Sequence, residues 1–553
     1  MHANQWLMAK TEAVAANGMV SSKHPLASLA GLEMLKQGGN AVDAAVATAF
    51  AVGVVEPWMN GLGGGGFMLV HLAKARRTLA IDFAMVAPAA AHPRMYQLED
   101  GVYEGIFPWR KTKDNENVYG YKAICVPGTV AGLSYALDRF GTMDLATVLQ
   151  PAIRYAEDGF PVDWFAMVQI ALDAEVVATF PETAEIFFKH GFPRKPLEGC
   201  KQEMIRQPAL AATLRRIAAN GADEFYRGET ARRIVAAMEA NGGLISKSDL
   251  AGYEPVVSEP TVEVAYRDCI VATSPGVSGG PTLAQALGLL DGFDLGAWGR
   301  GSARSLHMIA EVLRLAFADR FSHMGESAGN ESAWRTMLSQ EYIACRRNLI
   351  SMERAIDAIL PGNPIPSGST THLSVVDRER NMVSLTQTLL SRFGSRVTIP
   401  GTGVLMNNGM FWFNPEPGGA NEVMGGKRPL SNMAPALILR NGEPWVTLGA
   451  SGGRRIIGAV LQIATDLIDY GMSMQEAIGA PRIDVSTGRL LVDSRYPAEV
   501  VERLKAMGHD LLQVTESIAP RYFASPCGIM IDRKAGVLRG GADPFHPAVS
   551  IGF

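Results

Sequence analysis

The sequence predicts an α/β protein, and two patterns carry that prediction. Apolar and polar side chains alternate over residues 372–376 and again over residues 382–388, on either side of a polar cluster. This alternation is typical of a β-hairpin. Further along, residues 445–448 form a short apolar run that leads through glycines into apolar residues at helical spacing, which predicts a strand, a turn and a helix. With 553 residues the chain is long enough for several domains, and one large α/β body remains possible.

The chain begins with two predicted helices. His24 and a following proline begin the first, which ends before a pair of glycines at residues 38–39. Asn40 caps the second, which runs to Glu56. Its residues are small and apolar on all sides, so we expect this helix to be buried against a sheet.

A glycine run at residues 61–66 follows, and it formally satisfies the GxGxxG pattern of dinucleotide-binding proteins. That pattern requires a helix after the glycines, to receive a pyrophosphate at its N-terminus. Here residues 67–71 and 78–83 predict two strands instead. We therefore interpret the glycines as positions where two backbones approach closely.

The middle of the chain, residues 142–362, is mostly helical in pattern. Ser302 caps a predicted helix with one apolar face, which is typical of a core helix. Residues 255–268 and 270–273 predict a pair of short strands within this helical region.

Thr370 is the candidate nucleophile. The preceding residues, 360–369, are rich in proline, glycine and serine and predict a loop, and a strand begins after them. A threonine hydroxyl attacks poorly unless a base lies within reach, and the free amine of an N-terminal threonine supplies that base. A cut between Ser369 and Thr370 would release this amine, so the chain would be a zymogen. The alternative is an ordinary threonine at the start of a strand.

Two further features suit a nucleophile at this position. Thr388 lies on the second strand of the predicted hairpin, beside Thr370. Gly452 and Gly453 precede a helix, whose first N–H groups have no intrahelical partner and favour negative charge. These glycines could hold the oxyanion of a tetrahedral intermediate. By themselves they fit a tight connection between strand and helix equally well.

Composition excludes several classes of function. The formal charge of −4 and the lack of a Lys/Arg-rich tract argue against nucleic acid as a partner. The longest apolar run, residues 41–55, contains Asp43 and is shorter than the roughly 20 residues of a membrane-spanning helix. No secretory signal is visible, so we expect a cytoplasmic protein. The five cysteines are scattered, which argues against a disulfide framework or zinc site and predicts buried thiols; they are Cys125, Cys200, Cys269, Cys345 and Cys527.

Seven blocks of sequence, in order, resemble the γ-glutamyltransferase (glutathione hydrolase) family of N-terminal-nucleophile enzymes. They are GGNAVDAA at 38–45, GLGGGGF at 61–67, VPGTVAG at 126–132, AFADR at 316–320, TTHLSVVD at 370–377, KRPLSNM at 427–433 and GG at 452–453. The resemblance covers essentially the whole chain. It implies a four-layer αββα sandwich, and autocatalytic cleavage into a large subunit, residues 1–369, and a small subunit, residues 370–553. The two would associate as one unit and share the sheets.

The resemblance also implies a mechanism. Thr370 attacks the amide of a small-molecule substrate and forms an acyl-enzyme, while Gly452 and Gly453 hold the oxyanion. Thr388 and Thr371 support the nucleophile through hydrogen bonds, and Thr371 and Ser431 belong to the substrate-binding residues by matching position. No metal or organic cofactor is implied, because the nucleophile and its base share one residue.

The chain departs from the family at the residues that recognise the substrate. A γ-glutamyl group carries a carboxylate and an ammonium, and the family offers an arginine and an acid for them. Here Ala84 replaces the arginine, Trp412 the acid, Leu390 an asparagine and Asn432 a second serine. The stretch at 413–427 is also shorter than in relatives with a lid.

We therefore expect an amidase or acylase with altered specificity, similar to the cephalosporin (glutaryl) acylase and oxamate amidohydrolase branches of the family. Arg392, Arg396 and Arg454 could replace the missing carboxylate clamp, because arginine grips a carboxylate with two hydrogen bonds, although structural roles suit each of them too. Two alternatives remain. One is a true γ-glutamyltransferase or glutathione hydrolase, and the other is an unprocessed scaffold without catalytic activity. His372, beside the nucleophile, is interpreted as structural because the Thr370 amine makes a histidine base unnecessary.

Overall fold

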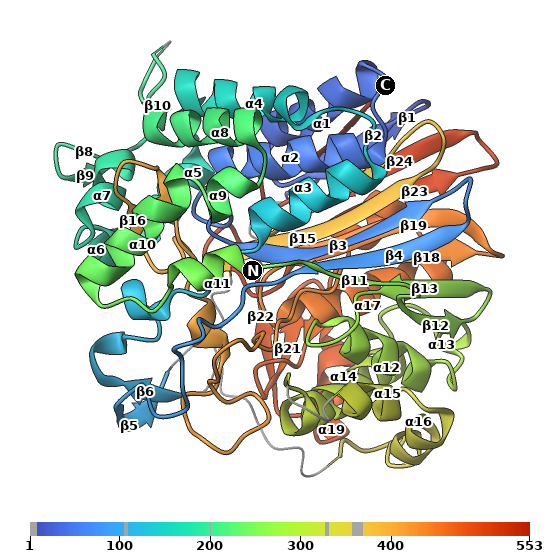
Figure 1. The fold of residues 1–553 in the computed structure, drawn as a ribbon. Helices are drawn as coiled ribbons and strands as arrows, with labels where there is room; N and C mark the ends of the chain where they lie inside the picture. Colours follow the sequence, from blue (N-terminus) through green and yellow to red (C-terminus); the bar gives the residue numbers. More distant parts are fainter. Residues whose placement is uncertain (1–7, 104–108, 200, 327–330, 357–368) are drawn as a thin grey trace.

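Two antiparallel β-sheets face each other, and helices cover both outer sides (Figure 1). The structure is a computed structural model that describes residues 8–103, 109–199, 201–326, 331–356 and 369–553. This is the four-layer αββα arrangement that the sequence led us to expect. Of the loop predicted at 360–369, only Ser369 lies within the described residues, as the first residue of a strand.

The first sheet has seven strands in the order β11, β4, β3, β15, β14, β2, β25, and all neighbours are antiparallel. Their bounds are β2 Met19–Ser22, β3 Gly65–Leu72, β4 Arg77–Phe83, β11 Val256–Ser258, β14 Ser369–Val376, β15 Met382–Leu390 and β25 Val549–Gly552. The predicted hairpin is confirmed as β14 and β15. It lies inside the sheet, so segments from both sides of Thr370 share one sheet.

The second sheet also has seven antiparallel strands, in the order β1, β24, β23, β19, β18, β13, β12. Their bounds are β1 Ala13–Ala15, β12 Val262–Tyr266, β13 Cys269–Thr273, β18 Ala436–Arg440, β19 Glu443–Ser451, β23 Ser525–Asp532 and β24 Val537–Ala542. β19 is longer than predicted. Its glycine at residue 449 was expected in the turn, but this residue pairs with Cys527 of β23 and continues the strand.

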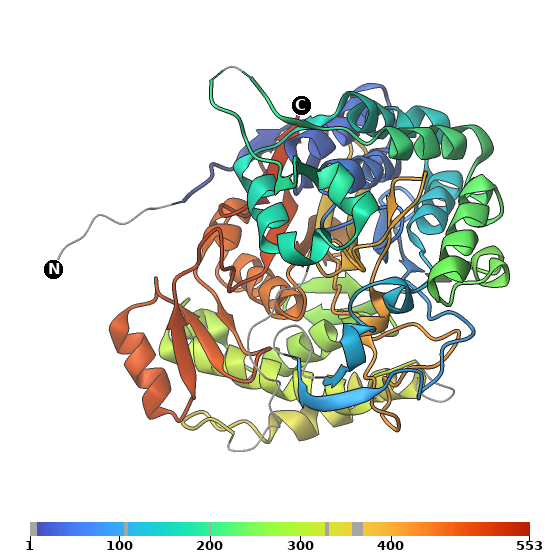
Figure 2. The same ribbon diagram turned by 90° about the vertical axis from the view of Figure 1, so that its left-hand side faces the viewer.

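The remaining strands of the described residues form five small sheets that are separate from the two large ones. They are β5 Leu98–Val102 with β6 Arg110–Thr112, β7 Phe160–Pro161 with β10 Met204–Ile205, β8 Phe188–Lys189 with β9 Phe192–Pro193, β16 Thr398–Ile399 with β17 Val404–Leu405, and β20 Ile483–Asp484 with β21 Leu490–Asp493 and β22 Leu511–Val514. In Figure 2 the sheet of β20 to β22 lies at the lower left, outside the sandwich. The sequence analysis did not predict these short strands.

The helices divide into two groups, one packed on each sheet (Figure 1). The first group is α1 Pro25–Lys36, α2 Ala41–Val55, α3 Thr129–Phe140, α4 Leu145–Asp158, α5 Trp164–Leu172, α6 Ala174–Val177, α7 Pro181–Phe187, α8 Pro208–Asn220, α9 Asp223–Tyr226, α10 Glu229–Asn241 and α11 Lys247–Ala251. The second is α12 Gly280–Leu290, α13 Leu295–Trp298, α14 Ala303–His323, α15 Glu331–Met337, α16 Gln340–Arg347, α17 Arg455–Ile468, α18 Met474–Gly479 and α19 Ala498–Ala506.

The predicted helix starts are confirmed. The imidazole of His24 accepts a hydrogen bond from the N–H of Leu26 at the start of α1. Asn40 and Asp43 form a reciprocal capping box at the start of α2, and Ser302 caps α14. Nearly every residue of α2 is buried, because this helix lies between the first sheet and the outer helices.

The two sheets contact each other through β14, β15 and β19. Thr447 of β19 donates a hydrogen bond to Ser374 of β14, at 3.2 Å, and Ser384 of β15 donates to the carbonyl of Leu448, at 2.9 Å. The imidazole of His372 lies against Gly449, where an added Cβ would come within 2.2 Å of the ring. The β14 and β19 backbones can therefore approach only because residue 449 has no side chain.

The thiols are buried as predicted at Cys125, Cys269 and Cys527. The prediction was wrong for Cys345, which is exposed on α16, a helix without buried residues. Cys200 lies outside the described residues.

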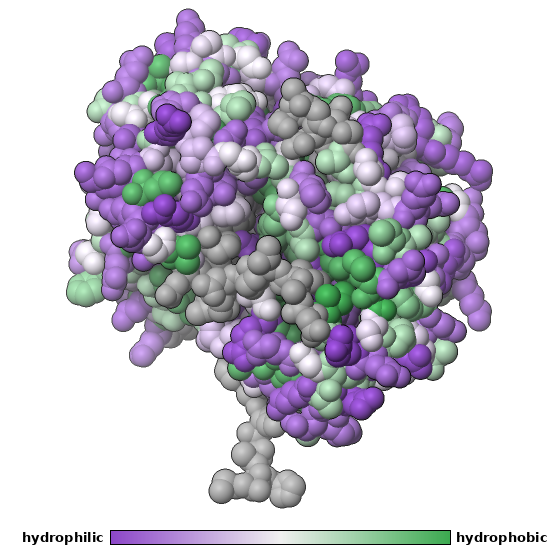
Figure 3. Space-filling model, turned by 90° about the horizontal axis from the view of Figure 1, so that it is seen from below, coloured by the Kyte–Doolittle hydropathy of each residue, from purple (hydrophilic) through white to green (hydrophobic). Residues whose placement is uncertain are grey.

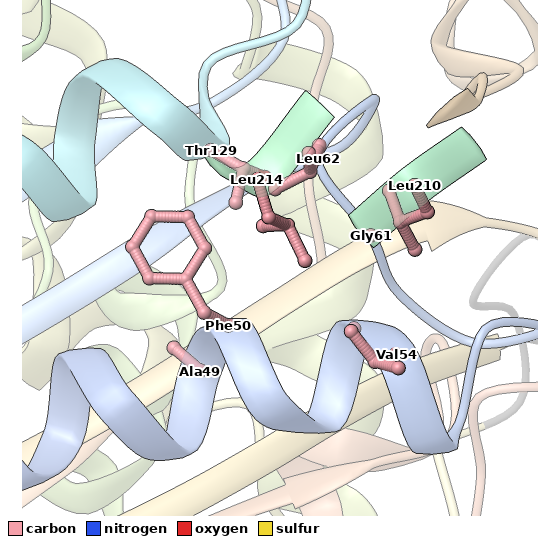
Figure 4. A pocket seen from close by; sticks show the side chains of 9 residues that line it. Ala49, Phe50, Val54, Gly61, Leu62, Thr129, Leu210 and Leu214 are labelled. Atoms are coloured by element: carbon pink, nitrogen blue, oxygen red, sulfur yellow. The ribbon is translucent and has the colours of Figure 1, made fainter. Parts of the chain in front are cut away.

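Within the described parts of the chain, none of the helices has both the length and the apolar character needed to cross a membrane. The face in Figure 3 is mostly hydrophilic, with hydrophobic residues gathered right of centre. A small apolar void lies between α2 and α8, lined by Phe50, Val54, Leu210 and their neighbours (Figure 4). It presents no charged group, and we interpret it as a packing gap.

Replacing Gly449 with alanine should force the sheets apart. The new methyl group would overlap the His372 ring, and overpacking of this kind costs about 1–3 kcal/mol. We expect a lower thermal unfolding midpoint for Gly449→Ala. Gly479→Ala is the control, because its Cβ would meet only the end of the Gln475 side chain at 3.9 Å. Equal midpoints for the two variants would contradict this account of the interface.

Candidate active site

Thr370 lies at the start of β14, where the pairing with β15 is irregular. Ser369 pairs with Leu390 and Thr371 pairs with Gln387, so Thr370 alone faces two residues of β15, one of which is Thr388. A bulge of this kind bends a strand and re-aims the side chains next to it. Thr388 is thus beside Thr370, as the hairpin predicted.

Thr370 lines a narrow pocket. The pocket encloses about 240 Å³ of empty space, open solvent included, and its lining residues are Thr370, Leu390, Trp412, Asn432, Met433, Gly453 and Ile456. Four of the predicted site residues therefore join Thr370 around one space, and these five residues come from five separate segments of the chain. Most of the wall is apolar, and Asn432 contributes an uncharged amide to it.

The glycine turn predicted to hold an oxyanion has a backbone conformation that favours glycine at both positions. Gly452 and Gly453 have φ values of 138° and 62°, which side-chain-bearing residues rarely adopt. A Cβ on Gly452 would also lie 2.9 Å from the Cα of Ala524. The turn leads into α17, at whose start Arg454 makes no side-chain cap. Backbone N–H groups at a helix start without a side-chain cap are suited to an anion.

The two supporting threonines have different partners. Thr388 is fully buried, and its hydroxyl accepts a hydrogen bond of 2.8 Å from the N–H of Leu390. This contact fixes the end of β15, where Leu390 has a φ of 87°. Thr371 points to the helical side of the sheet, where its hydroxyl donates to the carboxylate of Glu56 at 3.0 Å.

The walls behind the pocket belong to one apolar cluster. Ala84 and Phe411 are in this cluster with Leu390, Trp412 and Met433, and both lie behind the lining residues. Ala84 therefore shapes the wall rather than the pocket surface.

Ser431 is completely buried next to Asn432. Its hydroxyl accepts a hydrogen bond from the N–H of Met433 at 3.3 Å, and its own N–H donates to the carbonyl of Val277. The buried guanidinium of Arg320 donates to its carbonyl oxygen. Ser431 thus lies in a firmly held turn next to the lining residues Asn432 and Met433, and it is not itself among the lining residues.

The three arginines considered for a carboxylate clamp have other partners. Arg392 and Arg396 lie 3.8 and 3.0 Å from the carboxylate of Asp173. Arg454 stacks over the ring of Phe321, with the guanidinium carbon 4.8 Å from the ring centre. Among the described residues that line the pocket there is no arginine.

His372 lies on the same face of β14 as Thr370, and its ring is fixed between two hydroxyls. Nδ1 is 2.8 Å from Thr386 Oγ1, and Nε2 is 3.1 Å from Ser374 Oγ. Burial, together with the positive charge of Lys23, keeps the pKa of His372 well below its usual value. A neutral, doubly engaged imidazole fits the structural interpretation.

Sequence reasoning missed Met433 and Ile456 in the lining and Glu56 behind Thr371. Met433 directly follows the predicted Asn432, and Ile456 lies in the first turn of α17, just after the glycine turn. Both could have been predicted only from their position next to predicted site residues. For Glu56, the sequence predicted only that a helix ends there. Its contact with Thr371 joins residues 315 positions apart, which no local pattern shows.

One cluster of three potential metal ligands occurs among the described residues, namely His307, Glu311 and His509. The two histidines bind each other, with 2.7 Å between their ring nitrogens. Glu311 accepts hydrogen bonds from Arg314 and from the N–H of Ile356. Because these atoms already have hydrogen-bond partners, we interpret the cluster as a buried hydrogen-bond network.

Two facing sheets between helical layers, with a threonine at the head of a central strand, define an N-terminal-nucleophile hydrolase or transferase. A family model described as gamma-glutamyltranspeptidase matches residues 27–553. The chain belongs to the gamma-glutamyltranspeptidase family and is an enzyme of that class.

Relatives with two kinds of name are similar to this chain. Acylase ACY 1 proenzyme of Pseudomonas sp. (strain SE83) is 40% identical over 505 residues, which cover 91% of this chain and 89% of that protein. Glutathione hydrolase proenzyme of Escherichia coli (strain K12) is 38% identical over 548 residues, covering 96% and 90%. The crystal structure of cephalosporin acylase from Bacillus halodurans matches with a TM-score of 0.86 and 30% identity, over 100% of this chain and 99% of that one.

Gly452→Ala should abolish the function of the glycine turn while the chain still folds. The new Cβ would displace Ala524 and strain the backbone, and loss of one oxyanion donor costs about 10²–10³-fold in kcat in other enzymes. We expect the kcat of amide hydrolysis to fall by a factor of that size. Gly442→Ala is the control, because this glycine also has a positive φ, of 77°, but has open space around it. Similar rates for the two variants would refute the assignment.

Proposed function

We propose that this enzyme is an autoprocessed N-terminal-threonine amide hydrolase whose acyl group differs from γ-glutamyl. The observation that carries the proposal is that Thr370 and Gly453 line one pocket whose remaining walls are largely apolar. A nucleophile and an oxyanion site on opposite sides of one space are what acyl transfer requires. Relatives named acylase and cephalosporin acylase support it.

Maturation would use the same hydroxyl as turnover. Thr370 Oγ1 attacks the carbonyl carbon of Ser369, the C–N bond breaks, and the acyl group moves to oxygen while the nitrogen becomes an amine. Water then hydrolyses the ester, leaving a carboxylate on Ser369 and a free hydroxyl on Thr370. The products are a subunit of residues 1–369 and one of residues 370–553, which stay associated through the sheets that they share.

In turnover, the Thr370 amine takes the hydroxyl proton as Oγ1 attacks the substrate amide. The backbone at Gly452 and Gly453 stabilises the oxyanion, the leaving amine takes the proton, and an ester remains on Thr370. Water, activated by the same amine, hydrolyses this ester. Thr388 holds the end of β15 beside the nucleophile through its bond to Leu390.

The pocket favours an acyl group without an α-ammonium. Removing an ammonium from water without a counter-ion costs several kcal/mol, and Trp412 offers only a weaker cation–π contact where an acid would form an ion pair. Leu390 and Trp412 instead suit an apolar stem, and the Asn432 amide suits one polar group on it. Cytoplasmic residence stays a prediction.

The second candidate is a true γ-glutamyltransferase or glutathione hydrolase. The overall family and the Escherichia coli relative named glutathione hydrolase favour it. Such an enzyme would have to bind the γ-glutamyl carboxylate and ammonium with other residues.

A denaturing gel tests the maturation step. Purified wild-type protein should give two bands with a mass ratio of about 2:1, and Thr370→Ala should give one band, because it lacks the hydroxyl that starts the acyl shift. Edman sequencing of the smaller band should begin at Thr370. A single uncut band in the wild type would revive the scaffold alternative.

Substrate preference tests the acyl group. Hydrolysis of glutaryl and oxamate amides should exceed hydrolysis of γ-glutamyl anilide, and Trp412→Asp should move the ratio toward the γ-glutamyl compound by about tenfold, because a carboxylate can pair the ammonium. Trp412→Phe, which removes the indole without adding charge, should not produce this change. A wild-type preference for γ-glutamyl anilide would overturn the proposed specificity in favour of the second candidate.

A further inference from the structure

Behind the candidate nucleophile lies a buried carboxylate that the reaction described above does not use. Glu56 is the residue that ends α2, and only 1% of it is exposed. One carboxylate oxygen accepts the Thr371 hydroxyl at 3.0 Å, and the other lies 3.1 Å from Nε2 of His546. A single side chain thus connects the end of a helix, the strand of Thr370 and the C-terminal segment.

The tautomer of His546 follows from its second contact. Nδ1 accepts a hydrogen bond from the N–H of Ala548 at 3.2 Å, so Nδ1 carries no proton. In the neutral ring the proton is then on Nε2, which donates to Glu56. Burial keeps the pKa of His546 well below its usual value, so the ring is neutral. Both oxygens of Glu56 therefore receive a donor.

Charged groups from several elements surround Glu56. Burial raises the pKa of Glu56, while the positive charge of Lys23 and the hydrogen bond from Thr371 oppose the rise and stabilise the carboxylate; the charge of Asp163 adds to the rise. The ammonium of Lys23 is itself buried and donates to the hydroxyl of Ser525 at 2.6 Å and to its carbonyl. Ser525 pairs with Ser451, the residue before Gly452. Glu56 thus contacts the strand of Thr370, and Lys23, whose charge acts on Glu56, contacts β23, the strand that pairs with β19 just before the glycine turn.

Cleavage before Thr370 would make the contact of Thr371 with Glu56 more important. A new chain end frays unless something ties it down. Thr371 would be the second residue of that end, and its side chain contacts Glu56 of the helical layer, whereas Thr370 lines the pocket. Its bond to a buried carboxylate therefore fixes the strand without occupying the pocket.

We propose that Glu56 is a positioning residue for the Thr370 reaction, which it serves by holding Thr371 so that the Thr370 amine and hydroxyl stay aimed at the pocket. The inference rests on the proposed function. In the mature enzyme Glu56 would belong to the large subunit, and Thr371 and His546 to the small one, so this contact would also join the two subunits at the active site.

The test removes the contact from each side. Thr371→Val is nearly isosteric and lacks the donor, and Glu56→Met lacks the acceptor. Each should lower kcat about 10- to 100-fold, because small misplacements of a nucleophile have effects of that size, while KM stays within about twofold, since neither residue lines the pocket. Autoprocessing on a denaturing gel should slow in parallel.

Thr48→Val is the matched control. Thr48 is also a fully buried threonine, on α2, but its hydroxyl bonds to the carbonyl of Ala44 in the same helix. We expect this variant to process and turn over at the wild-type rate. Thermal unfolding of all variants then separates lost stability from lost positioning.

Two further variants distinguish positioning from a general packing role. Glu56→Gln keeps one acceptor for His546 and an amide N–H that can donate to the Thr371 oxygen, so it should recover most of the rate lost in Glu56→Met. The double variant Glu56→Met/Thr371→Val should be no slower than the slower of the two single variants, because the contact between residues 56 and 371 is already lost in each of them. If the fold-losses in kcat of the two single variants multiply in the double variant, the two residues act independently and the proposal is wrong.

Autoprocessing can be measured without an added substrate. Failure of the proposed function can therefore be distinguished from failure of the role of Glu56. If the wild type is not cut at Thr370, the proposed function fails. If the wild type is cut and Thr371→Val is cut and turns over at the rate of Thr48→Val, the role of Glu56 fails while the proposed function stands. A rise in KM alone, with kcat unchanged, would also reject positioning and would indicate that the residue contacts the substrate.

Discussion

The close approach of β14 to β19 is the constraint on which the rest of the site depends. Thr370 and the glycine turn belong to different sheets, and they face one pocket only because these two strands pack together. A glycine at residue 449 makes room for the ring of His372, and hydroxyl groups of Ser374, Ser384 and Thr447 bridge the sheets. Hydrogen bonds of this kind fix register as well as distance, because a buried hydroxyl that loses its partner costs about 1–3 kcal/mol. The geometry needed for acyl transfer is thus a property of the sandwich.

Within that frame, the specificity of the pocket comes from a few side chains at the ends of strands and turns. Leu390 is the last residue of β15 and has a φ that leucine rarely adopts, which the hydrogen bond from its N–H to Thr388 helps to maintain. Its side chain, Trp412 and Met433 provide apolar surface beside the candidate nucleophile. A γ-glutamyl group would lose its hydration there without gaining an ion pair, whereas an apolar acyl stem gains from burial. The same scaffold can therefore carry out the same chemistry on a different acyl group.

Sequence reasoning named several residues that the structure brings together around one pocket, but it did not find the residues that support them. Blocks around Thr370, Ser431 and Gly452 were visible because their chemistry is local, and so were the helix caps at Asn40 and Ser302. Ala84 was expected in the pocket, yet it lies behind it, because side-chain direction depends on the packing of β4 and its neighbours. The strand before the glycine turn was predicted too short, since glycines at its end are stabilised by pairing with β23. Glu56 looked like an ordinary helix end.

By itself, the sequence determined the class of fold, the family, the candidate nucleophile and the turn opposite it. These depend on residue types at short spacing, where backbone preference and hydrophobic period act directly. Only the tertiary structure decided which side chains line the pocket, that Arg392 and Arg396 pair with Asp173, and that a carboxylate at the end of α2 holds Thr371. Those contacts join residues hundreds of positions apart. They arise when two sheets and two helical layers bury their faces together, and no window of sequence contains that information.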